Sequence, residues 1–348
     1  MILAFNATAY DPLPSGAKSR TVGLAAALLR AGHAVRLLAP RGLSLRPEVE
    51  TEFGAPLPGS FEEIPTPLDP SSPLRRALAS RRWFERNVPR GTDAFVTDYY
   101  PVIDRAPTLL TVHDLRYLAA PQFEPARRVA WFRAFYPRMA RRAAGLVVPT
   151  RAVAAEAERF LRVPASRVAV VPNGLSRAWR EAAPSAERSG RLLMIGFAER
   201  RKGFATVLAA LREAPVAPPL DVAGRGRPPR EAADLVAAGR VRFLGPLEDA
   251  RLVDLCRRAT ALVHPSRYEG YGMTVIEAMA LGTPVLAARQ AAVEEVAAGY
   301  ATLLPPGDVA AWAEALARLP DAPPEAREAV RSWTWDASAV TLAAAAGS

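Results

Sequence analysis

Residues 265–280 read PSRYEGYGMTVIEAMA, and this stretch decides the fold expected for the whole chain. An apolar strand ends at its start, two glycines mark a loop, and apolar periodicity predicts a helix over about 275–280. Gly270 and Gly272 allow close approach of the backbone, and a helix N-terminus offers N–H groups that suit an anion such as a diphosphate. Glu269 and Glu277 can both point into a polar pocket, where carboxylates bind sugar hydroxyls strongly.

A structural interpretation competes for Glu277. The spacing from Thr274 to Glu277 is that of a capping box, in which two side chains satisfy the N-terminus of their own helix. Gly282 and Pro284 then end that helix. Both interpretations stay open at the level of sequence.

Short apolar runs alternate with helical patterns on either side of this stretch. In the first half a helix is expected over 19–31, and the expected strands are 1–7, 34–39, 94–97, 108–112, 145–148 and 167–171. In the second half a helix is expected over 204–213, and the expected strands are 191–195, 220–223, 241–244, 261–264 and 283–287. Such alternation predicts an α/β protein with parallel, doubly wound sheets.

Turn residues in the middle of the chain indicate two domains. Pro172, Asn173 and Gly174 are followed by a polar stretch that reaches Gly190. We therefore expect an N-terminal domain over 1–172, a hinge over 173–189 and a C-terminal domain over 190–332. A ligand should bind in the cleft that such halves form at the carboxyl ends of their strands.

Composition narrows the class of protein. Of 348 residues, 50% are apolar and 23% are charged. This composition is typical of a globular protein and excludes a disordered chain or a small disulfide-stabilised scaffold. The single cysteine, Cys256, excludes a disulfide and a cysteine-built zinc site. Histidines are scattered, with His33 read as a turn residue and His264 as buried structure, and no Asp-x-Asp pair occurs. We expect a cytoplasmic protein with no metal, no cofactor, no secretory signal and no membrane span.

The positive charge is distributed unevenly along the chain. Residues 1–170 carry 24 basic and 15 acidic side chains, whereas the net charge of the whole chain is +10. Residues 127–142 interleave six arginines with four aromatics, and residues 75–90 hold six arginines with Trp83 and Phe84. Both clusters suit the surface of an anionic membrane at its inner face. The alternative is that the aromatics pack inside while arginines cover a solvated face, as in an arginine-rich proteome; nucleic acid is not expected, because no binding module accompanies the charge.

Three further loops are candidates for chemistry. Residues 196–203, GFAERRKG, lie between a strand and a helix, where basic side chains can neutralise a phosphate leaving group. His113 and Asp114 follow an apolar strand, where substrates bind in such sheets, and Asp114 is expected to orient the loop. Residues 14–20, which include Gly16, follow the first strand. For each loop the alternative interpretation is a solvated or structural turn with no role in chemistry.

Together these segments resemble the retaining family 4 glycosyltransferases (glycosyl transferases group 1), which have the GT-B fold. The resemblance covers nearly the whole chain, and its most specific part is the E-x7-E stretch of Glu269 and Glu277 followed by AMALGTPV. It implies two Rossmann-like domains facing across a cleft, with residues 333–348 crossing back onto the first domain. It also implies transfer of a sugar, hexose-type, from a nucleotide diphosphate to an acceptor hydroxyl in polysaccharide or glycolipid assembly.

The resemblance also implies roles for individual residues. Glu269 would contact the donor sugar, Glu277 the ribose hydroxyls, and His113 would lie beside the transferred sugar. The backbone of Gly270, Tyr271, Gly272 and Met273 would approach sugar and diphosphate, and Gly16 would approach the phosphates from the other domain. Lys202 and a neighbouring arginine would neutralise the diphosphate.

One position departs from the family pattern. Many members carry arginine directly after the glycine that matches Gly196, and this chain has Phe197. The basic role is therefore assigned to Arg201, with Arg200 as the alternative. The acceptor is expected to be lipid-linked or acidic. Two other functions stay open, a nucleotide-sugar epimerase on the same fold and a non-catalytic nucleotide-sugar-binding partner.

Overall fold

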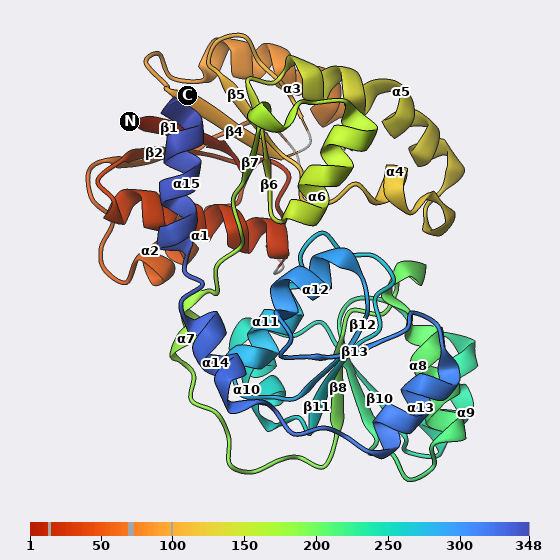
Figure 1. The fold of residues 1–348 in the computed structure, drawn as a ribbon. Coiled ribbons are helices and arrows are strands. Elements are labelled where there is room, and N and C mark those ends of the chain that lie inside the picture. Colours follow the sequence, from red (N-terminus) through yellow and green to blue (C-terminus); the bar gives the residue numbers. More distant parts are fainter. Residues whose placement is uncertain (13–14, 69–72, 99, 348) are drawn as a thin grey trace. The chain divides into compact units, whose positions relative to one another are not determined.

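The structure is a computed structural model that describes residues 1–12, 15–68, 73–98 and 100–347, without the side chains of 73–79. The chain forms two compact units (Figure 1). Unit 1 comprises Met1–Ser176 and Trp333–Ser348, and unit 2 comprises Arg177–Ser332. The change of unit after Ser176 falls within the expected hinge.

Unit 1 is built on a seven-stranded parallel sheet of order β3-β2-β1-β4-β5-β6-β7. Its strands are β1 Ile2–Asn6, β2 Ala34–Ala39, β3 Phe61–Pro65, β4 Ala94–Asp98, β5 Thr108–Thr111, β6 Gly145–Val148 and β7 Val168–Val170. Its helices are α1 Gly16–Arg30, α2 Arg46–Phe53, α3 Pro73–Asn87, α4 Arg116–Ala119, α5 Ala126–Arg142, α6 Arg151–Glu156 and α15 Trp335–Gly347. The order reverses direction at β1, as in doubly wound folds.

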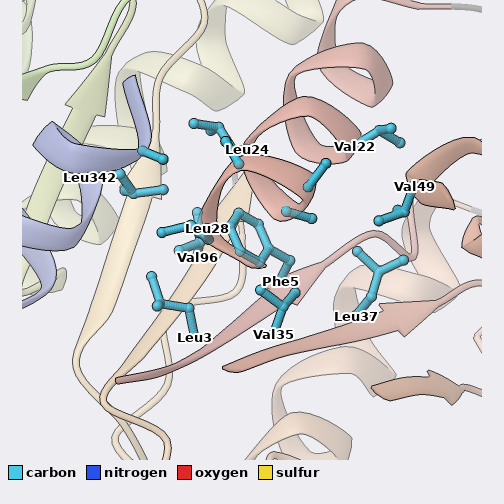
Figure 2. Close-up of a cluster of buried hydrophobic side chains, with 14 of the residues drawn as sticks. Leu3, Phe5, Val22, Leu24, Leu28, Val35, Leu37, Val49, Val96 and Leu342 are labelled. Carbon is cyan, nitrogen blue, oxygen red and sulfur yellow. The ribbon is translucent and has the colours of Figure 1, made fainter. Parts of the chain in front are cut away.

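The core of unit 1 joins the two ends of its chain. Side chains of β1, β2, α1 and the C-terminal helix α15 meet in one buried cluster (Figure 2). Ser15 caps α1 by accepting a hydrogen bond from the backbone N–H of Lys18 at 3.3 Å. Because α1 is covered by the sheet, α2 and α15, most of its residues are buried, and so it shows little amphipathic pattern.

Trp335 holds the C-terminal helix α15 against the rest of unit 1. Its side chain is fully buried. A Cβ at Gly23 of α1 would lie 2.3 Å from the indole, and a Cβ at Gly174 would lie 2.5 Å from the Trp335 backbone nitrogen. Both positions therefore require glycine for the ring to fit.

Unit 2 is built on a six-stranded parallel sheet of order β10-β9-β8-β11-β12-β13. Its strands are β8 Leu192–Ile195, β9 Leu220–Ala223, β10 Val241–Gly245, β11 Ala261–His264, β12 Val285–Ala288 and β13 Thr302–Leu304. Its helices are α7 Arg177–Glu181, α8 Phe204–Glu213, α9 Ala233–Ala237, α10 Asp249–Arg258, α11 Met273–Ala280, α12 Ala291–Ala297, α13 Val309–Ala317 and α14 Pro324–Arg331.

The predicted fold class is confirmed, since both sheets are parallel and helices connect most successive strands, β4 and β5 excepted. Two strands were not predicted, and both are sheet edges. Strand β3 contains Glu62, Glu63 and Pro65, which a central strand does not tolerate but an edge strand does. Strand β13 has three residues, too few to show a pattern.

Candidate functional site

The site in unit 2 centres on one carboxylate held by two cations. The Lys202 ammonium lies 2.6 Å from Oε1 of Glu269, and the Arg201 guanidinium lies 3.1 Å from Oε2. All three side chains are largely buried, with 14% of the Glu269 side chain exposed. Lys202 and Arg201 come from the loop after β8, and Glu269 comes from the loop after β11. Because neighbouring parallel strands end at the same edge, the two loops meet there.

Glycine and backbone hydrogen bonds bring these loops together. A Cβ at Gly203 would lie 2.1 Å from the carbonyl oxygen of Pro265, so only glycine fits there. The backbone N–H of Arg267 donates to the Arg201 carbonyl at 2.7 Å. Arg201 in turn donates to the Tyr268 carbonyl at 3.0 Å. The basic loop is therefore fixed to the glutamate loop before any ligand binds.

The charges of this cluster are strongly coupled. Burial by itself would raise the pKa of Glu269, but Lys202 and Arg201 hold that pKa well below its usual range. Glu269 is therefore ionised at neutral pH. Arg201 also lies 2.9 Å from the half-exposed carboxylate of Glu199, so the two cations are balanced by two carboxylates. An anionic ligand would compete with these carboxylates for Lys202 and Arg201.

The sequence missed two residues of this site, His264 and Gln290. His264 ends β11; its Nδ1 lies 3.0 Å from the Thr274 hydroxyl, and its Nε2 lies 3.8 Å from Oε1 of Glu269. Burial lowers the pKa of His264 to about 4, so the ring is neutral at pH 7. Gln290 follows β12 and accepts the backbone N–H of Glu269 at 3.2 Å. The prediction that His264 is buried is confirmed, and its place at a strand's carboxyl end was the available signal for its position beside Glu269.

The glycine loop leads into helix α11 as expected. The interpretation of Thr274 and Glu277 as a capping box is wrong. The helix begins at Met273 with Gly272 as its N-cap, at a φ of 105°. Thr274 is already inside the helix, and its hydroxyl binds His264 instead of capping. The first turn of α11 therefore has no side-chain cap, which leaves its N–H groups available to an anion. Tyr271 is buried next to this turn.

Glu277 lies one turn into α11, on the partly exposed side of the helix. Across the described part of the chain its carboxylate makes no hydrogen bond or ion pair. Burial, together with the charge of Asp249, raises the pKa of Glu277 to about 8. A carboxyl group with such a pKa is mostly protonated at pH 7.

The position that departs from the family pattern is filled by an aromatic cluster. Phe197 is buried against Phe204 and Phe243, with ring centroids 5.6 and 5.0 Å away. The two candidate arginines behave differently. Arg201 contacts Glu269, whereas Arg200 is exposed and has no side-chain partner in the described ranges. Arg201, not Arg200, belongs to the cluster.

His113 and Gly16 lie in unit 1. Nε2 of His113 is 3.0 Å from Oδ2 of Asp98 at the end of β4. The same carboxylate accepts the Tyr10 hydroxyl at 2.6 Å, and Tyr10 contacts Thr21 of α1 at 2.7 Å. Burial by itself would raise the pKa of Asp98, but His113 and the two hydrogen bonds lower it. Asp98 is thus a negative partner that orients His113, and the sequence did not single it out.

The loop that contains Gly16 leads into α1. Gly16 is exposed in the first turn of this helix, and Pro14 lies outside the described residues. Lys18 is buried, donating to the Pro12 carbonyl at 3.0 Å and lying 3.5 Å from Glu48. Asp114 accepts the backbone N–H of Arg116 at 3.1 Å and so orients its own loop, as expected.

The aromatic side chains of the two basic clusters divide between core and surface. On α3, Phe84 is fully buried and Trp83 packs against the same core. On α5, Phe132 stacks on Tyr117 at 4.1 Å and Tyr136 is buried. Trp131 and Phe135, however, are exposed. The helix continues through Pro137.

Within the described ranges no helix is long and apolar enough to cross a membrane, and no three acidic, histidine or cysteine side chains gather into a metal-binding group.

Family models match both halves of the chain. The model described as Glycosyltransferase Family 4 matches residues 14–179, and the model described as Glycosyl transferases group 1 matches residues 189–321. The chain belongs to the family 4 glycosyltransferases. The predicted family is thereby confirmed, and both halves of the E-x7-E stretch lie within the second match.

Individual proteins agree with this family. Glycogen synthase of Mycobacterium tuberculosis is 32% identical over 178 residues, which cover 48% of this chain and 43% of that protein. This chain thus spans less than half of that relative's length. The structure of sucrose-phosphate synthase from Thermosynechococcus elongatus superposes with a TM-score of 0.73 at 19% identity, over 99% of this chain and 97% of the other. HepE of Anabaena, solved with UDP and glucose, has a TM-score of 0.65 at 17% identity and covers 99% and 95%. The GT-B fold is shared with both.

Proposed function

We propose that this protein is a retaining glycosyltransferase that moves a hexose-type sugar from a nucleotide diphosphate sugar to an acceptor hydroxyl. The observation that carries this proposal is the buried Lys202–Glu269–Arg201 cluster beside the uncapped N-terminus of α11. A leaving diphosphate needs preorganised positive charge and N–H donors, and both are present at one sheet edge. The UDP bound by HepE supports a nucleotide donor.

The residues of this chain divide the work. Lys202 and Arg201 stabilise the negative charge that develops on the departing diphosphate. Glu269 and the backbone from Gly270 to Met273 bind the donor sugar, and Glu277 binds the ribose. His113, oriented by Asp98, lies beside the transferred sugar. A diphosphate oxygen can take the acceptor proton on the same face, so retention of configuration needs no protein nucleophile.

The acceptor is proposed to be lipid-linked or acidic, in the assembly of a polysaccharide or glycolipid. The arginines of α3 and α5 support peripheral contact with an anionic membrane, because basic residues near such a surface contribute about 1 kcal/mol each. On these helices Arg82, Arg86, Arg133 and Arg138 have no acidic partner in the described residues. The cytoplasmic side of the membrane fits this placement.

One experiment tests the proposal against its two rivals. Thermal-shift titration with nucleoside diphosphates and their sugars identifies the donor by ligand-linked stabilisation. Release of free nucleotide is then followed with and without extracts of candidate acceptors. A transferase releases nucleotide faster when its acceptor is present. Conversion of the donor sugar without nucleotide release would identify an epimerase, and binding with no turnover would identify a non-catalytic partner.

Donor affinity is expected to depend on the protonation of Glu277. The pKa of about 8 lies above the ordinary value of 4.5, so a ribose that prefers the carboxylate must displace a proton at pH 7. Between pH 7 and pH 9 most Glu277 carboxyl groups lose their proton, so the ionised fraction rises about tenfold. Nucleotide affinity should therefore also rise about tenfold over this range. Titration calorimetry at several pH values measures it.

The matched variant is Glu277→Gln, which cannot ionise. Its affinity should stay flat with pH and fall below that of the wild type by about 1–2 kcal/mol at pH 9, where a charged hydrogen bond has become neutral. Parallel pH profiles for both proteins would exclude contact between Glu277 and the nucleotide.

Activity is expected to survive chelation of divalent metals. Lys202 and Arg201 already supply the countercharge that a metal ion would provide to the diphosphate. Initial rates with and without EDTA should agree within twofold, about the precision of such a comparison. Complete loss of activity with EDTA that Mn²⁺ or Mg²⁺ restores would refute this expectation.

Membrane contact is tested by co-sedimentation with anionic liposomes at about 0.1 M salt, where screening is partial. The protein should pellet with the vesicles and be released as salt rises. The double change Arg82→Glu and Arg133→Glu should weaken binding, whereas Arg318→Glu, an 86% exposed arginine of unit 2, should not. A protein that stays in the supernatant at every lipid composition would favour a soluble acceptor.

A further inference from the structure

A groove runs between α5 and the segment that follows β4 in unit 1. Its volume is about 340 Å³, within the range of small-molecule sites. One wall is formed by Tyr100, Pro101 and Val102, and the other by Trp131, Phe135 and Met139 of α5. We call this the α5 groove. Its floor and walls are apolar.

Two aromatic side chains that line the groove are exposed to solvent. Among the described residues, Trp131 and Phe135 are the only aromatic members of the group of exposed large apolar side chains, at 42% and 56%. Their ring centroids lie 5.8 Å apart. Of the other two aromatics of the same helix, Tyr136 is buried in the core and Phe132 is partly buried against it. A contiguous apolar patch on an otherwise arginine-rich helix marks a contact with an apolar ligand.

The rim of the groove is basic. Arg81 of α3 and Arg138 and Arg142 of α5 line it. Arg81 and Arg142 share one carboxylate, that of the 70% exposed Asp104, at 2.8 and 3.3 Å. Arg138 contacts the backbone carbonyl of Ala134 on its own helix and has no carboxylate partner in the described residues. Guanidinium groups next to an apolar wall complement a ligand that joins an apolar chain to a phosphate.

One wall of the groove starts two residues after Asp98, whose carboxylate holds His113. The backbone N–H of Tyr100 donates to the Asp98 carbonyl at 2.7 Å, and the Asp98 carboxylate holds His113. The carbonyl of Tyr100 accepts the side chains of Asn6 and Thr97 at 3.2 and 3.0 Å. The backbone of Tyr100, in the wall of the groove, is therefore held to the ends of β1 and β4, and β4 carries Asp98.

We propose that the α5 groove binds the chain and phosphate of a lipid-linked acceptor. A single isoprenoid or acyl chain lies over Trp131 and Phe135, its phosphate or diphosphate meets Arg138 and Arg142, and the sugar or hydroxyl end points toward His113. This assignment rests on the proposed function, because it gives a substrate class to the acceptor side of that reaction. The occupant is one lipid molecule, as opposed to the bilayer surface that the arginines of α3 and α5 contact.

The test is a titration of the full chain with geranylgeranyl diphosphate, followed by calorimetry. Geranylgeraniol, which has the chain alone, and inorganic diphosphate, which has the head alone, are titrated in parallel. The complete probe should bind at least about tenfold more tightly than either fragment, since each contributes its own contacts. The Lys202→Ala variant is titrated as well and should bind the probe as the wild type does, which excludes binding at the donor site.

The variant that should lose binding is the double change Trp131→Ala and Phe135→Ala. Its affinity should fall about 10- to 100-fold, the factor expected when two aromatic contacts are removed. Arg138→Glu should weaken the complete probe and leave geranylgeraniol unchanged. The matched controls are Val216→Ala, at a 78% exposed position, and Arg318→Glu, both in unit 2, and they should bind as the wild type does. Circular dichroism verifies folding, which these exposed positions should not affect.

Three outcomes overturn the assignment. Equal affinity of wild type and groove variants for the probe would place the lipid elsewhere. The groove would instead be a bilayer contact if the wild type showed no measurable probe binding while the groove variants no longer sedimented with vesicles of 7:3 phosphatidylcholine and phosphatidylglycerol. Probe binding that Lys202→Ala abolishes would place the diphosphate in the donor site. The proposed function is judged separately, by donor binding to unit 2, so either result can fail alone.

Discussion

Replacing Lys202 by alanine is expected to lower kcat/KM about 10²- to 10³-fold, the loss typical of one preorganised electrostatic donor. The ammonium group lies 2.6 Å from Glu269 and is only 19% exposed, so it is fixed in place before the donor binds. In its absence the leaving diphosphate loses a positive charge, and Glu269 keeps Arg201 as its remaining close cation. Steady-state kinetics of nucleotide release with the identified donor and acceptor measure the effect.

The controls for this prediction are the two neighbouring arginines. Arg201→Ala should cost activity comparably, because the guanidinium also contacts Glu269, and it should in addition loosen the loop that Arg201 ties to the Tyr268 carbonyl. Arg200→Ala should cost much less, since that side chain is exposed and lies outside the cluster. Normal turnover by Lys202→Ala would show that the phosphate assignment is wrong.

Replacing Trp335 by alanine is expected to destabilise unit 1 by about 3–5 kcal/mol, as for other buried tryptophans. The indole is fully buried between Gly23 and Gly174, and no nearby chain can collapse into the space without moving α15. The loss should appear in calorimetry as a lower unfolding temperature for the transition of unit 1, while the transition of unit 2 stays in place.

Val340→Ala on the same helix is the matched control. Its side chain is 68% exposed, so its change in unfolding free energy should stay within about 0.5 kcal/mol. Should Trp335→Ala unfold at the same temperature as Val340→Ala, the buried indole would contribute nothing to the stability of unit 1.

The cation pair around Glu269 has a consequence for the proposed chemistry. An ionised, doubly paired carboxylate is a poor proton acceptor and a poor nucleophile, because its lone pairs are already engaged. It can nevertheless accept hydrogen bonds from sugar hydroxyls once a diphosphate competes for Lys202. This reasoning agrees with a mechanism in which the enzyme's main contribution is to stabilise the leaving group.

The amino-acid sequence by itself determined the two parallel sheets and the glycine loop before α11. Strands buried on both faces are continuous apolar runs, and the helices between them are apolar on one side, so both patterns are local and readable. Local chemistry also indicated Glu269 and the basic loop 196–203, and the family resemblance assigned roles to Glu269, Lys202 and Arg201. The structure brings these three into one cluster, although Lys202 and Glu269 are 67 residues apart.

Only the tertiary structure decided which side chains share the site and which way they face. The roles of His264 and Gln290 depend on where β11 and β12 end in the sheet, because these ends bring both side chains to Glu269. The Thr274 hydroxyl could have capped α11, but the chain places His264 within 3.0 Å of it and the helix starts two residues earlier than a capping box requires. Likewise, the aromatics of α5 are equally apolar in sequence, and only packing against Tyr117 sends Phe132 inward while Trp131 and Phe135 stay at the surface. Such choices depend on contacts between distant segments, and these exist only after the chain has folded.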